Sequence, residues 1–393
     1  MNETKNMKFK SVKISNKLRR TAIGLPVLGA LCLGMSMSSC ESLYDDQSDC
    51  RTGINLAFIY DYHMEPGANA FPANVDCVTV YVFDPQGNYL TQLTETSDEL
   101  RDENYRMPLE LPEGSYHLVV YGGTTCEDAT VEFTPGWTSS TTSGHKNDIL
   151  VTVPTDANGE SAKQLHDIDT RTGGLFYGTL DVTITEKDFT MGTFRTETVN
   201  LMKDTNHIQV ILQELSQPDQ MNHEDYDFFI DDDNFTLNGY NNPVYTTSRG
   251  GALTGKTYKP FARQNRIMGY VDAEGRTGTQ VEEDPSKPVQ VACAEFSTSR
   301  LVTGHAATSR LRVTTSLEQD KDGNDKEIIN IPLITYLQAT RGFGDTWIKS
   351  DQEYLDRQSR WNLMFFLQRN AWVSTRVVVN SWVVRINDIE LNQ

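Results

Sequence analysis

Hydrophobic and polar residues alternate with a period of two along most of the chain after Gly53. This period is typical of strands that bury one face, and the runs are rich in β-branched and aromatic residues. Turn residues separate the runs, which indicates short strands stacked as sandwiches. The runs that predict strands are 54–60, 78–83, 116–121, 148–153, 175–184, 197–202, 207–215, 228–230, 289–296, 309–316, 328–333, 361–367 and 374–386.

Helical periodicity is sparse, and only residues 334–339 and 351–357 are predicted to be helical. The chain is therefore predicted to be all-β. A polar, glycine-containing stretch between Glu186 and Thr196 separates two groups of strands. We place the domain boundary there, which predicts an N-terminal β-sandwich over 53–190 and a C-terminal β-sandwich over 191–393.

The first forty residues have a different pattern. A basic segment extends to Arg20, an apolar run interrupted by Gly and Pro follows from Ala22 to Met35, and small residues lead to Cys40. The run is too short and too broken for a spanning helix, so 1–39 is predicted to be a cleaved signal peptide. The residues before Cys40 resemble a lipobox. This resemblance implies diacylglycerol and an N-acyl lipid on the cysteine, whereas the alternative is an ordinary secretory peptide.

Residues 40–52 are predicted to be a lipidated acidic tether, and Asp45-Asp46 resemble the signal that sends Bacteroidetes lipoproteins to the outer cell surface. The whole chain has 35 basic and 54 acidic residues, and loss of 1–39 removes seven basic residues and one acidic residue. The mature charge is then 28 − 53 = −25. Nucleic-acid partners are excluded, because binding them depends on clustered Lys and Arg.

No catalytic constellation is found. Motifs for serine hydrolases, zinc peptidases and nucleotide binding are absent from the sequence, and no His pair has metal-ligand spacing. We therefore predict no enzyme, no metal and no cofactor other than the lipid. The acidic segments 320–327 and 231–234 are interpreted as turns rather than calcium loops. In a loop that starts at Asp320, position six is Asp325 instead of the required Gly, and position twelve is Ile331 instead of a bidentate Glu. At most one disulfide is predicted among Cys50, Cys77 and Cys126.

Two further features bear on partners. Tyr240, Tyr245 and Tyr258 either stack on sugar rings or cover the second core, and the sequence favours the core. The run 374–386 reads as one long apolar strand that pairs within its own sheet or, by β-augmentation, with a neighbour. An uncovered strand of this kind would be an aggregation hazard, and the intramolecular pairing is the default.

Several segments in order resemble the FimB-type fimbrial anchor lipoproteins of Bacteroidales. The resemblance covers the whole mature chain, and it depends on the order of the segments rather than on any one of them. They are 40–46 with Cys50, 70–72, 80–84, 87–89, 174–178, 205–210, 354–358, 362–367 and 380–385.

The resemblance implies two transthyretin-like Greek-key β-sandwiches in an outer-membrane lipoprotein at the base of a fimbria, with fimbrillin stalk subunits as partners. Stalk subunits of this class lose their first strand to an Arg-specific protease, whereas an anchor keeps it. Here the first strand is expected to remain and the tail to contact the last stalk subunit. Alternatives are a stalk or tip subunit and a surface glycan-binding lipoprotein. The predicted partner contacts are Val377, Val379, Trp382, Val383, Val384 and Ile386.

Overall fold

The structure is a computed structural model that describes residues 51–64, 67–123, 132–133, 144–152, 174–190, 193–217, 221–244, 256–274, 282–341, 347–379 and 382–386. Residues 50–393 group into one compact unit. The predicted signal peptide, Cys40 and the tether as far as Cys50 lie outside the described residues. Among the helices that are described, none is long and apolar enough to cross a membrane.

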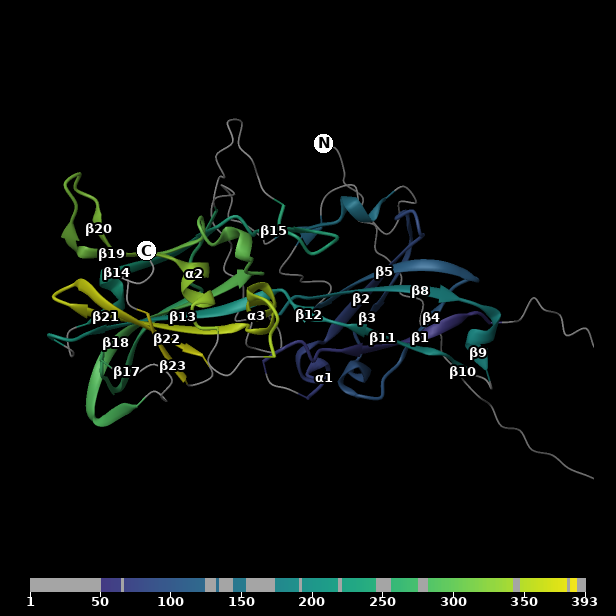
Figure 1. Cartoon of the computed structure of the whole chain (residues 1–393), viewed down its shortest axis with the longest axis horizontal. Coiled ribbons are helices and arrows are strands. Elements are labelled where there is room, and N and C mark those ends of the chain that lie inside the picture. Colours follow the sequence, from purple (N-terminus) through teal and green to yellow (C-terminus); the bar gives the residue numbers. More distant parts are fainter. Residues whose placement is uncertain are drawn as a thin grey trace, which may run out of the picture. The chain divides into compact units, whose positions relative to one another are not determined.

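The N-terminal sandwich packs a five-stranded sheet against a three-stranded sheet (Figure 1). Ile54 and Leu56 of the small sheet meet Val80 and Val120 of the large one, and all four side chains are fully buried. Their alternate spacing is the reason why these segments form strands with one face in the core. In order of paired neighbours, the five-stranded sheet contains β12 (Met202–Lys203), β8 (Phe176–Ile184), β5 (Gly114–Gly123), β2 (Cys77–Phe83) and β3 (Tyr89–Glu95). The three-stranded sheet contains β11 (Thr196–Asn200), β1 (Gly53–Ile59) and β4 (Met107–Glu110).

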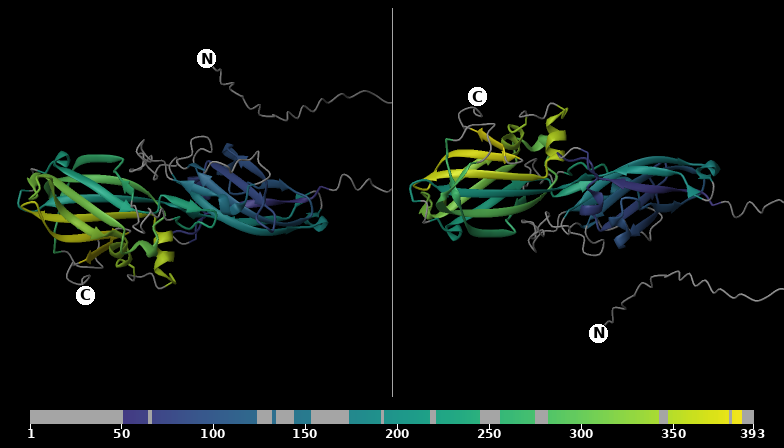
Figure 2. Two further views of the ribbon diagram at one scale, coloured as in Figure 1. Left: turned by 90° about the horizontal axis from the view of Figure 1, so that it is seen from above. Right: turned by 90° about the horizontal axis from the view of Figure 1, so that it is seen from below.

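The C-terminal sandwich packs a six-stranded sheet against a four-stranded sheet, and Figure 2 shows its green and yellow strands from two sides. Phe296, Leu363 and Phe365 lie in the shared core with Phe228 and Leu311. In order of paired neighbours, the six-stranded sheet contains β17 (Ala262–Val271), β18 (Glu283–Ser299), β13 (Thr205–Glu214), β21 (Arg360–Gln368), β22 (Ala371–Val379) and β23 (Trp382–Ile386). The four-stranded sheet contains β16 (Lys256–Tyr258), β14 (Tyr226–Asp232), β19 (Arg310–Gln319) and β20 (Asp325–Pro332).

A further layer covers part of the outer face of the five-stranded sheet. Ile149 and Val151 pack there against Tyr81, Val119 and Tyr121. This layer is the sheet of β15 (Thr236–Asn238), β7 (Leu150–Thr152) and β6 (Glu132–Phe133). The other elements are the hairpin β9 (Phe189–Thr190) and β10 (Thr193–Phe194), the helices α1 (Phe71–Asn74), α2 (Leu333–Gln338) and α3 (Asp351–Arg357), and the 3₁₀ turns η2 (Asp98–Arg101), η3 (Lys146–Asp148), η4 (Glu186–Asp188), η5 (His223–Asp225) and η6 (Thr303–His305).

The predicted all-β architecture of two sandwiches is confirmed, and both predicted helices form. The signals for α3 are local: the Ser350 hydroxyl accepts a hydrogen bond from the Glu353 amide at 3.1 Å, and Glu353 pairs with Arg357 one turn later. Tyr354 and Leu355 turn to the core. Local capping and the apolar face therefore determine this helix.

The boundary predicted at 190/191 is too early. β11 pairs in parallel with β1, and β12 pairs with β8, so both strands belong to the N-terminal sheets. β13 is the first strand of the C-terminal sheet, and the chain changes sandwich at Asp204. The polar stretch near residue 190 instead forms η4 and the β9–β10 hairpin.

The two acidic segments differ from each other. Asp320 closes the predicted hairpin turn, because its carboxylate accepts hydrogen bonds from the amides of Asp322 and Asn324. The interpretation of 231–234 as a solvated turn is wrong. Asp232, at the end of β14, is buried and pairs with the His305 imidazole. The local sequence pattern could not show this burial, because His305 is distant in sequence.

Candidate functional site

Three features bear on the predicted role of this chain, and the first is strand β1. It lies between β11, to which it is parallel, and β4, to which it is antiparallel. Ile54 and Leu56 are fully buried in the N-terminal core, and Phe58 packs beside them. β1 is therefore an internal strand of its sandwich, with partners on both edges.

The chain entering β1 is also held. The Thr52 hydroxyl donates to the Leu111 carbonyl at 2.7 Å, and Arg51 forms an ion pair with Glu110. Arg51 is also 5.6 Å from the ring centre of Phe194. These contacts attach the last two residues of the predicted tether to the N-terminal sandwich.

The second feature is the C-terminal segment, which forms a hairpin rather than one long strand. Val379 stands opposite Trp382, and β22 pairs with β21 on its other edge. The intramolecular pairing, which was the default expectation, is therefore present. β23 ends the sheet, and no strand pairs with its outer edge within the described residues.

The hairpin contains every residue predicted to contact a partner. The register brings Val377 opposite Val384, Val378 opposite Val383, and Thr375 opposite Ile386. Val377 is fully buried in the C-terminal core. Its selection as a partner contact is therefore wrong, because the same alternation that suggested a donor strand points Val377 inward.

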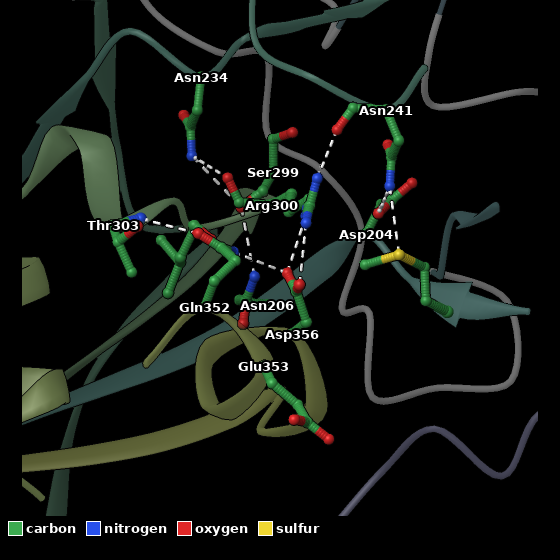
Figure 3. Close-up of polar contacts among 12 residues, drawn as sticks. Asp204, Asn206, Asn234, Asn241, Ser299, Arg300, Thr303, Gln352, Glu353 and Asp356 are labelled. Carbon is green, nitrogen blue, oxygen red and sulfur yellow. Dashed lines mark hydrogen bonds and ion pairs between the residues drawn. The ribbon is translucent and has the colours of Figure 1, made fainter. Parts of the chain in front are cut away.

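The third feature is a buried polar network where the chain passes from one sandwich to the other (Figure 3). Asp204, between β12 and β13, has no exposed surface, and its amide donates to the Leu175 carbonyl at 2.7 Å. One carboxylate oxygen accepts from the Asn241 side-chain amide at 2.8 Å, and the other has no hydrogen-bond partner in the described part of the chain. The connection is thus fixed by a buried acid.

Arg300 continues this network into the C-terminal sandwich. Its guanidinium forms a two-pronged pair with Asp356 of α3, at 2.7 and 2.8 Å, and donates to the Asn241 carbonyl. Gln352 donates to Asp356 at 2.9 Å and accepts from the Thr303 amide at 2.9 Å. Figure 3 shows the groups converging from α3, the end of β18 and the Asn241 loop. Two-pronged charged pairs fix geometry, so this set orients the elements around Asp204.

Burial raises the pKa of Asp204 to about 7. Arg300 and the hydrogen bond from Asn241 oppose this rise, and Asp356 adds to it. The desolvation effect exceeds the effect of the cation, because Arg300 is already paired with Asp356. The Asp204 carboxyl group therefore changes between its neutral and charged forms near neutral pH.

Two more contacts cross the same region. β15 follows β14 of the C-terminal sandwich in the chain, but it pairs with β7 of the layer on the N-terminal sandwich. Next to β15, the Gly239 carbonyl accepts a hydrogen bond from the Tyr177 hydroxyl of β8 at 3.0 Å. Arg357 of α3 lies 4.0 Å from the ring centre of Tyr62 and 4.9 Å from that of Trp347. The sequence did not reveal this region, because its members lie far apart in the chain, with the contacting Tyr62 and Arg357 separated by 357 − 62 = 295 positions.

Of the remaining predicted residues, Tyr258 is fully buried and Tyr240 is half exposed, whereas Tyr245 lies outside the described residues. Cys77 is disulfide-bonded, and Cys50 and Cys126 lie outside the described residues. Cys293 is a buried thiol. Three or more His, Cys, Asp or Glu side chains do not gather at a metal-binding distance anywhere in the described ranges.

Comparisons with solved structures support the fold. A proposed adhesin from Bacteroides thetaiotaomicron has 34% identity and a TM-score of 0.65, with 86% of this chain and 99% of that chain covered. A proposed polysaccharide-binding protein from the same species has 28% identity and a TM-score of 0.63 over 86% and 99%. The fimbrial anchor protein Mfa2 from Porphyromonas gingivalis has 17% identity and a TM-score of 0.55 over 86% and 100%.

No curated protein sequence matches the chain. Residues 47–388, however, match the family described as fimbrillin-A associated anchor proteins Mfa1 and Mfa2. This match spans both sandwiches and agrees with the resemblance found in the sequence. The chain belongs to the family of fimbrillin-A associated anchor proteins.

Proposed function

We propose that this chain is an outer-membrane lipoprotein, held by lipid on Cys40, that anchors a surface fimbria at its base and ends the polymer there. Family membership supports the association with fimbriae. The position of β1 supports the finer role, because a subunit whose own first strand fills its sandwich has no groove open to a neighbour's strand.

The observation that carries this proposal is the burial of β1 together with the residues around it. From Thr52 to Leu100 the sequence contains neither Lys nor Arg. An Arg-specific protease therefore has no site at which to separate β1 from the next strands. Cleavage at Arg51 would leave β1 attached to its sandwich and remove only the lipidated tether.

The contacts between the two sandwiches around Asp204 match the mechanical load that a base subunit would carry. A fimbria pulls on its anchor, and the pull passes from the partner contact to the lipid through both sandwiches. The β15–β7 pairing, the Tyr177–Gly239 hydrogen bond and the Arg357–Tyr62 contact resist separation there, in addition to the single covalent connection. The buried Arg300–Asp356 pair lies within the C-terminal sandwich and holds α3, which carries Arg357, in place for these contacts.

We place the contact with the last fimbrillin stalk subunit at the C-terminal hairpin, through β23 and the residues after it. The outer edge of β23 offers main-chain donors and acceptors to an added strand. Val379, Trp382, Val383, Val384 and Ile386 belong to this hairpin, whereas Val377 supports it from the core.

Mass spectrometry of the mature N-terminus in isolated outer membranes tests the proposal against the rival role of a stalk or tip subunit. We expect an acylated N-terminal Cys40 on a chain that retains β1. A mature N-terminus beyond Ile59 would show that β1 is removed and would overturn the anchor role.

A further inference from the structure

The outer face of the N-terminal five-stranded sheet contains an open cleft of about 740 Å³, away from β1 and the C-terminal hairpin. Tyr240 in its lining is followed directly by Asn241 of the junction network. β5 and β8 form its floor, and the β2–β3 turn, η3 and the Tyr240 loop form its sides. The volume lies in the range of roughly 300–1,000 Å³ that is usual for small-ligand sites. Neither the family nor the proposed anchoring accounts for this cleft.

The walls of the cleft are fixed before any ligand binds. Asp84 closes the β2–β3 turn by accepting from the amides of Gln86 and Asn88, at 2.9 and 2.8 Å. The His145 imidazole contacts the Gln86 carbonyl at 2.9 Å and accepts from the Asn147 amide of η3 at 3.0 Å. Gly87 has φ +89°, and a Cβ there would lie 2.6 Å from this imidazole. Two segments distant in sequence therefore form one rigid wall.

The cleft presents an aromatic ring of fixed orientation. Tyr240 is half exposed, and its hydroxyl donates to the Asn147 side chain at 2.8 Å. The Lys146 ammonium lies 4.6 Å from the centre of the ring. The hydrogen bond to Asn147 and the contact with Lys146 thus fix the orientation of the Tyr240 ring. The exposed part of the ring is available for stacking against a ligand.

Polar groups on the floor complete the site. The Asp181 side chain is 85% exposed and is held 2.5 Å from His117 Nδ1 across β5 and β8. The hydroxyls of Ser115 and Thr183 lie 3.0 Å apart on the same strands. An oriented carboxylate and paired hydroxyls accept and donate hydrogen bonds in the pattern that vicinal sugar hydroxyls require.

Other ligand classes fit less well. Among the described residues that line the cleft, Lys146 is the one permanent cation and Asp84 and Asp181 are acidic, so an anionic ligand would meet no excess positive charge. An added peptide strand cannot pair with β5, because β8 and β2 pair with its two edges. The outer edge of β8 beside the cleft lies beyond the pairing with β12 at Phe176 and Tyr177, and there the Arg195 side chain donates to the Thr183 carbonyl at 3.1 Å. A neutral ligand with many hydroxyls and an apolar C–H face matches both the ring and the floor.

We propose that this cleft binds a neutral oligosaccharide, with Tyr240 as the stacking platform and Asp181 as the main hydroxyl acceptor. The proposal is independent of anchoring, since neither the lipid nor β23 takes part. It assigns to Tyr240 the sugar-stacking role that the buried Tyr258 lacks.

Saturation-transfer NMR and calorimetry on the full mature protein test this proposal, with maltotriose, cellotriose, laminaritriose and N,N′,N″-triacetylchitotriose as probes at up to about 10 mM. We expect saturable binding of at least one probe. Tyr240→Ala should weaken that binding about tenfold or more, whereas Tyr240→Phe keeps the ring and should stay within about threefold. Asp181→Asn should also weaken it.

Trp347→Ala provides a matched control, because it removes an aromatic side chain of similar exposure elsewhere. It should leave binding unchanged, and thermal unfolding of each variant should verify its fold. Failure of all four sugars to bind overturns the proposal, and so does binding that survives Tyr240→Ala in a folded protein.

Discussion

At the scale of single residues, the buried Asp204 predicts how the free energy of unfolding depends on pH. Its pKa in the folded chain is about 7, above the usual value of 3.8, because burial disfavours the charged form. The folded chain therefore binds more protons than the unfolded chain between these values, and the neutral carboxyl's contribution to stability is lost as the pH rises through this window. Asp204→Asn keeps a hydrogen-bond acceptor and cannot ionise.

We expect Asp204→Asn to match the parent protein near pH 4 and to become the more stable of the two as the pH approaches 7. The difference in the free energy of unfolding should grow by at most about 1.4 kcal/mol per pH unit and stay constant above pH 7. Urea unfolding from pH 4 to pH 9 measures it. Asp322→Asn removes an exposed charge at a hairpin tip and serves as the control; a flat difference for Asp204→Asn would contradict the prediction.

Residue environments were the part of the structure least visible in the sequence. Asp231 and Asp232 look like solvated turn residues, yet Arg312 pairs with the first and His305 with the second. Tyr258 is buried, as the sequence favoured, but its hydrogen bond to Asn234 at 2.8 Å was not predictable. These partners are distant in sequence, and a local pattern contains no information about them.

At the scale of elements, the central position of β1 predicts a large energetic contribution. Leu56→Ala removes a fully buried side chain and should lower the free energy of unfolding by about 2–5 kcal/mol. Leu90→Ala makes the same chemical change in β3, where the side chain is 45% exposed, and should cost within about 0.5 kcal/mol. Urea unfolding distinguishes the two, and equal losses would show that β1 is not part of the core.

The C-terminal hairpin gives a second prediction at this scale. Removal of residues 382–393 deletes an edge strand and leaves β22 paired with β21. We therefore expect an exported, folded protein to which fimbriae no longer attach, as measured by electron microscopy of cells and by fimbrillin in the culture medium. Thermal unfolding verifies the fold, and fimbriae that stay attached would exclude β23 as the contact.

Elements were predictable where their signals were local. The run 78–83 and the capped helix 351–357 were identified correctly, because alternation and capping act over a few residues. The parallel pairing of β1 with β11 joins segments far apart in the chain, and the domain boundary was misplaced for this reason. The single long strand predicted over 374–386 is a hairpin, because the run continues the same apolar pattern through the reversal.

At the scale of the whole molecule, an anchor must connect two ends mechanically: lipid at one and fimbria at the other. β1 connects the tether to the N-terminal core, the Asp204 network connects the two sandwiches, and the hairpin presents a sheet edge that no described strand covers. Damage at any one of these points should therefore detach fimbriae without preventing the subunits from polymerising.

Cys40→Ala tests the first of these points. Without the thiol no lipid is attached, and the two or three acyl chains that would hold the protein, at about 0.8 kcal/mol per buried CH₂, are lost. We expect fimbriae of normal subunit composition to appear in the medium with this chain at one end, detected by immunogold labelling. A protein that lost only its location would leave fimbriae on the cell, and that outcome would contradict the anchor role. Ser39→Ala keeps a small residue before Cys40 and should retain attachment, which separates loss of the lipid from a general defect in export.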